Sequence, residues 1–232
     1  MAELSLKVIF DNKSLRPELE PGWGFACVVY LPDKTILFDT GADGGILTEN
    51  MQKLNVNPEE IEAVVLSHAH WDHANGLGNF LAANSRVTVY LPKSFPDNYK
   101  GSIKEAGARV EEISGGRMLF ERVYTTGEMQ GIIAEQALAI ITSRGLVVIT
   151  GCAHPGIVSI VRKAKELTGE NVYMVLGGFH FPERSVVDSF RELGVQKAAP
   201  CHCSGNEAIE FFAQDYDNDF IQVGVGLEFD IE

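Results

Sequence analysis

Short apolar runs alternate with amphipathic stretches along most of the chain. Near its beginning, apolar runs at residues 6–10, 25–30 and 35–38 are separated by turn residues, a pattern that predicts antiparallel strands. The Leu-Pro-Asp-Lys sequence at 31–34 predicts a hairpin turn. Asp43 is placed to cap a helix that runs to Leu54.

The second half alternates strands with helices more clearly. Apolar runs at 146–150 and 172–176 predict strands, and residues 186–193 predict a helix that Gly194 ends. Further elements are predicted from local signals: a helix start at Asn57-Pro58, strands at 63–67 and 87–91, a helix from Pro155 to Gly169, a capping box at Ser204-x-x-Glu207, and strands within 220–229. Residues 92–136 are poorly patterned, and strands are predicted there.

Two stretches of the chain resemble each other. Residues 35–42 (TILFDTGA) and 146–153 (LVVITGCA) both run from an apolar strand through Thr-Gly to a helix start. This similarity predicts two related halves. No linker rich in Pro, Ser or Gly separates them, so a single domain is expected over residues 1–232.

Composition excludes several classes of protein. With 232 residues and 45% hydrophobic residues, the chain can bury a sizeable core. The net charge of −13 disfavours binding to nucleic acids and to anionic membranes. The sequence shows neither a membrane span nor a signal peptide, and four cysteines are too few for a disulfide scaffold. Together these features predict a cytoplasmic protein.

The six histidines are confined to four short segments. Each segment follows a predicted apolar strand and carries Gly or Pro where the backbone must turn sharply. Strand ends at one edge of a layered α/β fold bring functional groups together, so we expect these segments to meet. They are residues 67–76 (SHAHWDHANG), 151–156 (GCAHPG), 177–180 (GGFH) and 200–205 (PCHCSG).

The first segment has the pattern H-x-H-x-D-H. In extended backbone, alternate residues point the same way, so His68 and His70 can hold one metal ion just past a strand. Asp72 and His73 lie where the chain turns toward a helix and can face a second ion. Imidazole nitrogens and carboxylate oxygens suit zinc, iron or manganese.

Ligand counting favours two ions. With His154, His180 and His202, the candidate groups exceed the four of a tetrahedral site, and a pair of ions about 3.5–4 Å apart would use them. For His180 alone, an ordinary hydrogen-bonded histidine is an equal interpretation. A closed structural zinc site is an alternative for Cys152, His154, Cys201 and Cys203, although no Cys-x₂-Cys pair is present.

Other residues carry weaker signals. Cys27 lies in an apolar strand and is expected in the core. Trp23, Trp71 and Phe179 could line a pocket, but packing is the favoured interpretation. The sequence contains no P-loop and no G-x-S-x-G nucleophile motif.

The segment 67–76, together with residues 37–41 (LFDTG) and His202, resembles the metallo-β-lactamase superfamily over about residues 25–226. The resemblance implies an α/β fold, a four-layer αβ/βα sandwich of two mixed β-sheets flanked by helices. The segments GCAHPGIV, GGFH and PCHCSG are similar to the subgroup named after an archaeal dihydropterin–ribofuranosylaminobenzene phosphate synthase.

The resemblance also implies a ligand set. His68, His70 and His154 would bind one metal ion, and Asp72, His73 and His202 would bind the other. Asp39 would hold the ligand loop by hydrogen bonds. The family has a histidine before the later strand and an acidic residue after it. Here no histidine lies between 73 and 154, and Cys152 stands at the acidic position, either as a soft ligand or, as we favour, as a small buried residue.

These observations predict a metal-dependent hydrolase that uses two divalent ions, zinc before iron or manganese, against an ester, amide or phosphoester bond. Asp72 and His180 are the expected catalytic residues. One alternative is a synthase that condenses pterin-like and aryl-ribosyl phosphate substrates, and another is a di-iron redox or metal-sensing protein. The expected partner is a small molecule, with phosphorylated compounds among the candidates, whose specificity we assign to loops at 15–24 and 95–107. The sequence does not indicate the oligomeric state.

Overall fold

A computed structural model describes residues 3–232, which form two compact units. The first unit contains the chain up to Ile113 together with Gly224–Glu232, and the second contains Ser114–Val223. Each unit is built on one mixed β-sheet. The single domain expected from the sequence stays a prediction.

The sheet of the first unit has seven strands in the order β13-β1-β2-β3-β4-β5-β6. Strand β3 pairs antiparallel with β2 and parallel with β4, so the sheet changes character there. Leu31 pairs with Lys34, which confirms the predicted hairpin turn. The strands are β1 (Leu4–Phe10), β2 (Ala26–Leu31), β3 (Lys34–Phe38), β4 (Ala63–Val65), β5 (Thr88–Pro92), β6 (Arg109–Ile113) and β13 (Glu228–Ile231).

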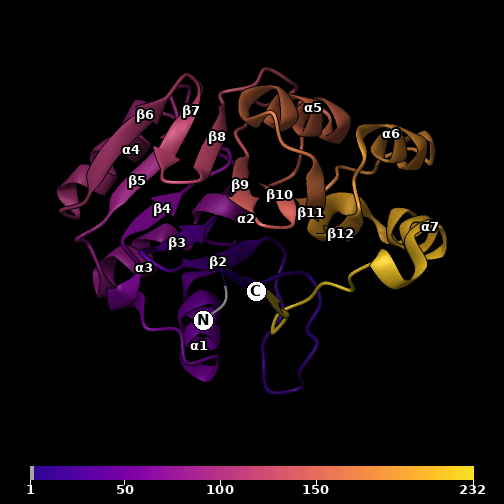
Figure 1. Ribbon diagram of the computed structural model, residues 1–232. Helices are drawn as coiled ribbons and strands as arrows, with labels where there is room; N and C mark the ends of the chain where they lie inside the picture. The colour runs from indigo at the N-terminus through magenta and orange to yellow at the C-terminus, as the bar shows by residue number, and fades with distance from the viewer. Residues whose placement is uncertain (1–2) are drawn as a thin grey trace. The chain divides into compact units, whose positions relative to one another are not determined.

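Helices connect the parallel strands of this unit and pack on its sheet (Figure 1). Asp43 caps the first of them through hydrogen bonds from the amides of Gly45 and Ile46, as predicted. Leu47 and Met51 of that helix enter the hydrophobic core. The helices are α1 (Gly44–Lys53), the 3₁₀ turn η1 (Pro58–Glu60), α2 (Trp71–Ala74), α3 (Leu77–Ala83) and α4 (Asp97–Glu105).

The sheet of the second unit has six strands in the order β12-β11-β10-β9-β8-β7. Its strands are β7 (Gly115–Phe120), β8 (Val123–Gly127), β9 (Leu138–Thr142), β10 (Gly145–Thr150), β11 (Val172–Gly178) and β12 (Lys197–Cys201). Its helices are α5 (Ile157–Thr168), α6 (Ser185–Leu193), η2 (His202–Ser204), α7 (Asn206–Tyr216) and η3 (Asp217–Asp219). Gly169 and Gly194 end α5 and α6 in the left-handed conformation, as predicted.

The two units repeat one topology. Strand β10 pairs antiparallel with β9 and parallel with β11, just as β3 does with its neighbours. A helix follows each of these strands, α1 after β3 and α5 after β10. The similarity between residues 35–42 and 146–153 therefore marks equivalent positions in two related units.

Some predicted elements differ from the structure. Helix α4 forms within the region predicted as strands, and it occupies most of the predicted specificity loop at 95–107. Ile103 and Tyr99 of this helix pack on the core, and the buried Lys100 side chain donates hydrogen bonds to the Lys93 carbonyl at 2.7 Å and to Glu112 at 3.0 Å.

The predicted capping box at Ser204 is wrong. Helix α7 begins after Gly205 without a side-chain cap. The Ser204 hydroxyl instead accepts from the amide of Phe179 and donates to the carbonyl of Cys201. It therefore joins the loops that follow β11 and β12 rather than the helix end. Near the C-terminus, β13 covers Glu228–Ile231, and Phe220 contributes an isolated bridge to Ala198.

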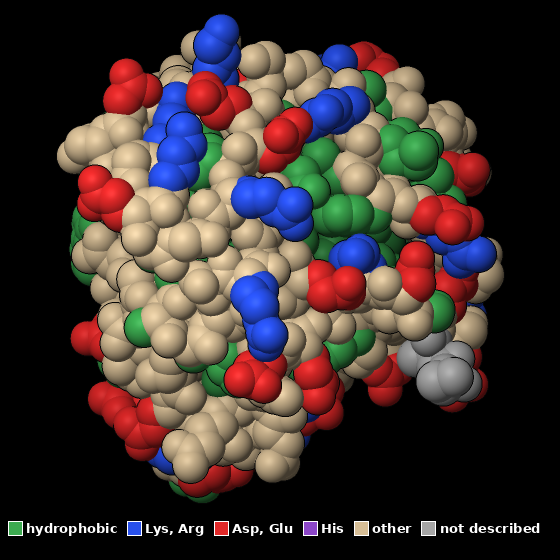
Figure 2. Space-filling model, turned by 90° about the vertical axis from the view of Figure 1, so that its left-hand side faces the viewer, with side chains coloured by type: hydrophobic (Ala, Val, Ile, Leu, Met, Phe, Trp, Pro, Cys, Tyr) green, Lys and Arg blue, Asp and Glu red, His purple; other side chains and the backbone are tan. Residues whose placement is uncertain are grey.

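The surface carries charges of both signs. Figure 2 shows one face of the molecule, on which Lys and Arg side chains are interspersed with Asp and Glu rather than gathered into a basic stripe. No helix among residues 3–232 has the length and apolar character needed to cross a membrane.

Candidate functional site

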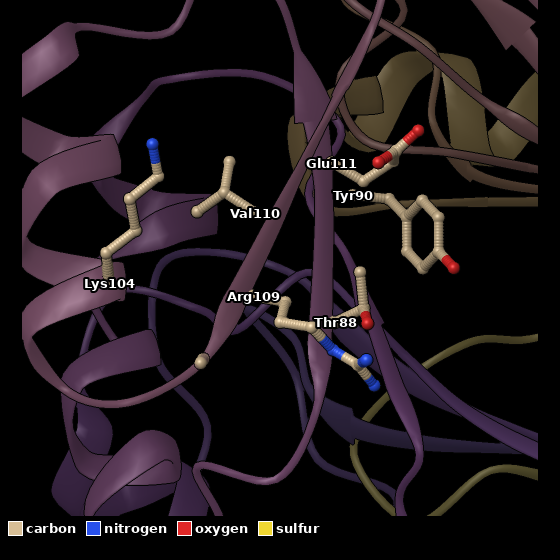
Figure 3. A pocket seen from close by; sticks show the side chains of 7 residues that line it. Thr88, Tyr90, Lys104, Arg109, Val110 and Glu111 are labelled. Atoms are coloured by element: carbon tan, nitrogen blue, oxygen red, sulfur yellow. The ribbon is translucent and has the colours of Figure 1, made fainter.

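A hollow of about 630 Å³ lies along β5 and β6 of the first unit (Figure 3). Thr88 pairs with Arg109 and Tyr90 with Glu111, so polar side chains line it from neighbouring strands. No histidine or cysteine lines this hollow. The candidate chemistry of the first unit lies instead after β4.

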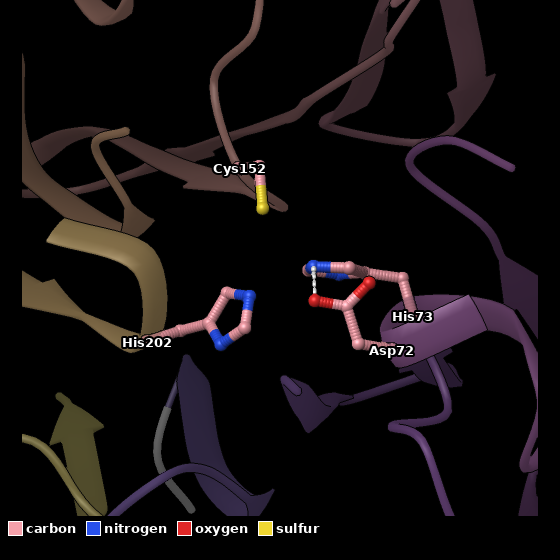
Figure 4. A group of neighbouring side chains, drawn as sticks. All are labelled: Asp72, His73, Cys152 and His202. Atoms are coloured by element: carbon pink, nitrogen blue, oxygen red, sulfur yellow. Dashed lines mark ion pairs between the residues drawn. The ribbon is translucent and has the colours of Figure 1, made fainter. Parts of the chain in front are cut away.

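The chain leaves β4 at Val65 and stays non-helical until α2 begins at Trp71. His68 and His70 lie in this segment, and their Nε2 and Nδ1 atoms are 3.1 Å apart. Asp72 and His73 lie on the short helix α2, as Figure 4 shows, with His73 Nε2 3.9 Å from the Asp72 carboxylate. The structure thus brings together, within the first unit, the four groups predicted from the H-x-H-x-D-H pattern.

Asp39, which follows β3, organises this segment. Its fully buried carboxylate accepts hydrogen bonds from the amide of Ser67, from the Ser67 hydroxyl and from His73 Nδ1, each at 2.7 Å. An ionised carboxylate only accepts, so His73 carries its proton on Nδ1. The lone pair of His73 then lies on Nε2, on the side of Asp72.

The same carboxylate sets the tautomer of His68 through Ser67. The single hydroxyl proton of Ser67 is donated to Asp39, so the 2.9 Å contact between Ser67 Oγ and His68 Nδ1 places a proton on that nitrogen. His68 Nε2 therefore carries a lone pair and faces His70. These relations fit a metal site, because metal-binding histidines donate their other ring N–H to a carboxylate or a similar partner.

Backbone contacts fix the position of α2. Thr40 donates hydrogen bonds to the His73 carbonyl from both its amide and its hydroxyl. The Tyr99 hydroxyl of α4 donates to the Ala74 carbonyl at 2.6 Å. Burial and the nearby Asp39 charge raise the pKa of Tyr99, which keeps this donor protonated. Gly24 packs so closely that a Cβ there would lie 2.2 Å from the Asp72 carbonyl oxygen.

In the second unit, Glu135 plays the part that Asp39 plays in the first. Its fully buried carboxylate accepts hydrogen bonds from the amides of Cys152, Ala153 and His154, each at 2.9 Å, and from His154 Nδ1 at 2.8 Å. His154 is thereby held with its lone pair on Nε2. Sequence reasoning missed Glu135; the available signal was a lone charge within the apolar segment 134–142.

The other candidates of the second unit follow its parallel strands. Cys152 follows β10, His180 follows β11, and His202 and Cys203 follow β12; Figure 4 draws Cys152 and His202. One ligand atom each of Cys152, His180 and Cys203 lies within 4.8 Å of the others. This grouping differs from the predicted closed zinc set, since it contains His180 in place of His154 and Cys201. No disulfide joins the cysteines of the described residues.

The aromatic residues divide into two groups. Phe179 is buried against Phe190 and Phe212, which confirms the packing interpretation. Trp23 is 50% exposed and Trp71 is 56% exposed, so that interpretation is wrong for both. Trp23 precedes Gly24 and Trp71 precedes Asp72, the two residues whose backbones lie close together. Cys27 lies in the core, as predicted.

A sequence model of the metallo-β-lactamase superfamily matches residues 22–128. The 7,8-dihydropterin-6-methyl-4-(β-D-ribofuranosyl)-aminobenzene-5′-phosphate synthase of Methanocaldococcus jannaschii is 30% identical over 244 residues, which cover 83% of each chain. The solved structure of a metal-dependent hydrolase of the β-lactamase superfamily is 26% identical, covers 98% of this chain and 99% of its own, and superposes with a TM-score of 0.82. A metallo-β-lactamase fold protein from Bacillus subtilis is 14% identical with a TM-score of 0.70, covering 98% of this chain and 99% of its own.

The chain therefore belongs to the metallo-β-lactamase superfamily of enzymes. Its two mixed sheets with flanking helices confirm the predicted fold class. Within that class, the archaeal synthase is a relative along most of the chain, as the resemblance in the later histidine segments implied.

Proposed function

We propose that this protein is a metal-dependent hydrolase. One observation carries the proposal: buried carboxylates fix the tautomers of three histidines, Asp39 those of His68 and His73, and Glu135 that of His154. In each case the proton sits on Nδ1 and the lone pair on Nε2. A histidine that serves only in packing has no need of this arrangement, whereas a metal ligand does.

The proposed ligands are His68, His70 and His154 for one ion and Asp72, His73 and His202 for another. Six groups exceed the four that a single tetrahedral ion accepts. Nitrogen and carboxylate donors suit zinc and also admit iron or manganese. We also propose that residues 1–232 act as a single functional domain.

Divalent ions in such a site polarise a carbonyl or phosphoryl oxygen and lower the pKa of a coordinated water molecule to about 7. Asp72 would orient the attacking water through its carboxylate and accept its proton. His180, whose side chain is exposed, would donate a hydrogen bond to the negative charge that develops on the substrate. Asp39 and Glu135 would act through the histidines that they orient.

Two measurements test this proposal. The first is the metal content of the purified protein and of the His70→Ala variant, which we expect to lose both metal and activity. The second is hydrolysis of a panel of esters, amides and phosphoesters in isotopically labelled water, which should place the label in the product. Full activity of the metal-free protein would contradict the proposal.

A synthase is the second candidate, and the archaeal relative favours it because its name describes a synthase. In that case the same side chains would activate a leaving group instead of water. The product of pterin-like and aryl-ribosyl phosphate substrates would contain a new C–C or C–N bond and no label from the solvent. Product analysis therefore separates the two functions.

A further inference from the structure

We propose that Cys152, His180 and Cys203 form a binding site for a thiophilic divalent cation such as zinc or cadmium. The two sulfur atoms and a ring nitrogen of His180 all lie within 4.8 Å of one another. All three residues belong to the second unit. Neither cysteine belongs to the ligand set proposed above for hydrolysis.

The topology of the sheet explains why these residues meet. Strands β10, β11 and β12 are parallel neighbours, with Thr150 paired to Gly177 and Gly178 paired to Cys201. Their carboxyl ends therefore lie at one edge of the sheet, where the loops of open α/β sheets bind ligands. Each of the three loops supplies one member of the group.

The packing keeps the two cysteines close. The Cys203 thiol donates a hydrogen bond to the Cys152 carbonyl at 3.5 Å. Gly178 lies between them, since a Cβ there would be 2.6 Å from Cys203 Sγ and 3.2 Å from Cys152 Cα. A larger residue at this position would displace the Cys203 side chain or the backbone at Cys152.

His180 completes the group from the solvent side. Cys152 and Cys203 are only 4% and 5% exposed, whereas His180 is exposed. His180 and Phe181 both have positive φ angles, 52° and 49°, a backbone conformation that is strained for residues other than glycine. The amide of Phe181 donates to the Cys203 carbonyl at 3.1 Å and so ties this strained turn to the cysteine loop.

The donor set determines the class of ion. Two thiolates and an imidazole are soft ligands that select zinc or cadmium over magnesium or calcium. Zinc–sulfur bonds of about 2.3 Å place two sulfurs about 3.8 Å apart, so the observed group needs shifts of about 1 Å or less. Three protein ligands leave a fourth position for solvent, and binding releases the thiol protons.

Occupation of this site would affect the reaction proposed above. Since His180 is also proposed to contact the substrate, an ion held here would withdraw its imidazole, and excess zinc or cadmium would inhibit. That consequence rests on the proposed function. Binding of the ion to this site does not depend on the proposed function, and it is therefore measured by spectroscopy and not by turnover.

The experiment uses the full chain with the triple substitution His68→Ala, His70→Ala and His73→Ala, which removes the histidines of the first unit. Cadmium titration should give thiolate-to-metal charge-transfer absorption that saturates at one ion per chain. In this background, Cys203→Ala should lose about half of the absorption. Its affinity for cadmium should fall by more than the roughly 10–100-fold that is typical for loss of a residue that only supports a ligand. Cys201→Ala is the matched control, because it removes a buried neighbouring thiol outside the group, and it should leave both unchanged.

A second measurement uses the otherwise unaltered protein, in case the triple variant does not fold. Cadmium should protect Cys152 and Cys203, but not Cys201, from alkylation in partly denaturing conditions, as read by mass spectrometry. An absorption band and a protection pattern that depend on Cys152 alone would assign this cysteine to the hydrolytic set and overturn the proposal. Absence of both the band and the protection would overturn it equally, while leaving the hydrolase proposal intact.

Discussion

Single carboxylates determine how the histidines of this protein can be used. Asp39 and Glu135 are fully buried. The carboxylate of each accepts hydrogen bonds from a histidine Nδ1 and from backbone amides of the segment that carries that histidine. Buried charges are costly unless they are fully hydrogen-bonded, and both carboxylates meet that condition. The same hydrogen bonds that satisfy the buried carboxylates also fix the orientation of each histidine.

The substitution Glu135→Gln tests whether this carboxylate orients His154 for metal binding. The amide group of glutamine is a donor, so it would face one of the N–H groups that the carboxylate now accepts from. We expect metal affinity to fall about 10–100-fold and the free energy of unfolding to fall by about 1–3 kcal/mol. Chelator competition and denaturant titration measure these quantities.

The matched control for this substitution is Glu170→Gln. Glu170 is exposed at the end of α5 and contacts none of the candidate ligands through a described hydrogen bond. Its substitution should change neither metal affinity nor stability. Equal metal affinity in the Glu135 variant and the control would show that His154 is not a ligand oriented by Glu135.

At the scale of elements, helix α2 has only four residues and depends on its neighbours for its position. Contacts from the loop after β3, from α4 and from Gly24 hold it from several sides. A helix this short has little intrinsic stability. The placement of Asp72 and His73 is therefore a property of the surrounding elements and not of α2 itself.

Gly24→Ala should displace α2. A Cβ at Gly24 would lie 2.2 Å from the Asp72 carbonyl oxygen, and the φ of +143° disfavours any other residue. We expect loss of metal from the ligands on α2 and reduced thermal stability, measured by metal analysis and calorimetry. Gly78→Ala is the control, because no atom lies within 4 Å of its Cβ position in α3, and alanine stabilises a helix by about 0.5–1 kcal/mol. Full metal content in Gly24→Ala would refute this account of α2.

At the scale of the whole molecule, burial of weak acids makes stability depend on alkaline pH. Burial raises the pKa of Tyr30 and of Tyr216 to about 12, and it also raises the pKa of the Cys27 thiol. The folded chain therefore keeps protons that the unfolded chain loses. The stabilisation is complete below the pKa of the unfolded groups, about 10 for tyrosine, and is lost as the pH rises toward 12.

We accordingly expect the free energy of unfolding to decline above about pH 10, by up to about 1.4 kcal/mol per pH unit for each tyrosine concerned. Denaturant titrations of the metal-free protein at increasing pH measure this slope. Tyr216→Phe should reduce the slope while costing about 1 kcal/mol at neutral pH for its hydrogen bond to the Val195 carbonyl. A slope that is identical in the two proteins would show that Tyr216 does not contribute.

Local signals in the sequence located most strands, several helix ends and the histidine segments, because each depends on neighbouring residues. Asp43 at the start of α1 and the glycines that end α5 and α6 are of this kind. The two mixed sheets were implied by the resemblance to the metallo-β-lactamase superfamily. Helix α4 was missed because its buried face combines few apolar residues, Tyr99 and Ile103, with Lys100, which donates hydrogen bonds to Lys93 and Glu112.

The sequence by itself therefore determined which side chains follow which strands and which chemistry they can offer. Only the tertiary structure decided which atoms of those side chains form hydrogen bonds with the buried carboxylates and which keep a lone pair. Asp39 meets Ser67 and His73 across 28 and 34 residues, and Glu135 meets His154 across 19. Hydrogen bonds over such separations have no periodicity to reveal them, since they arise when the sheets bring distant strand ends together.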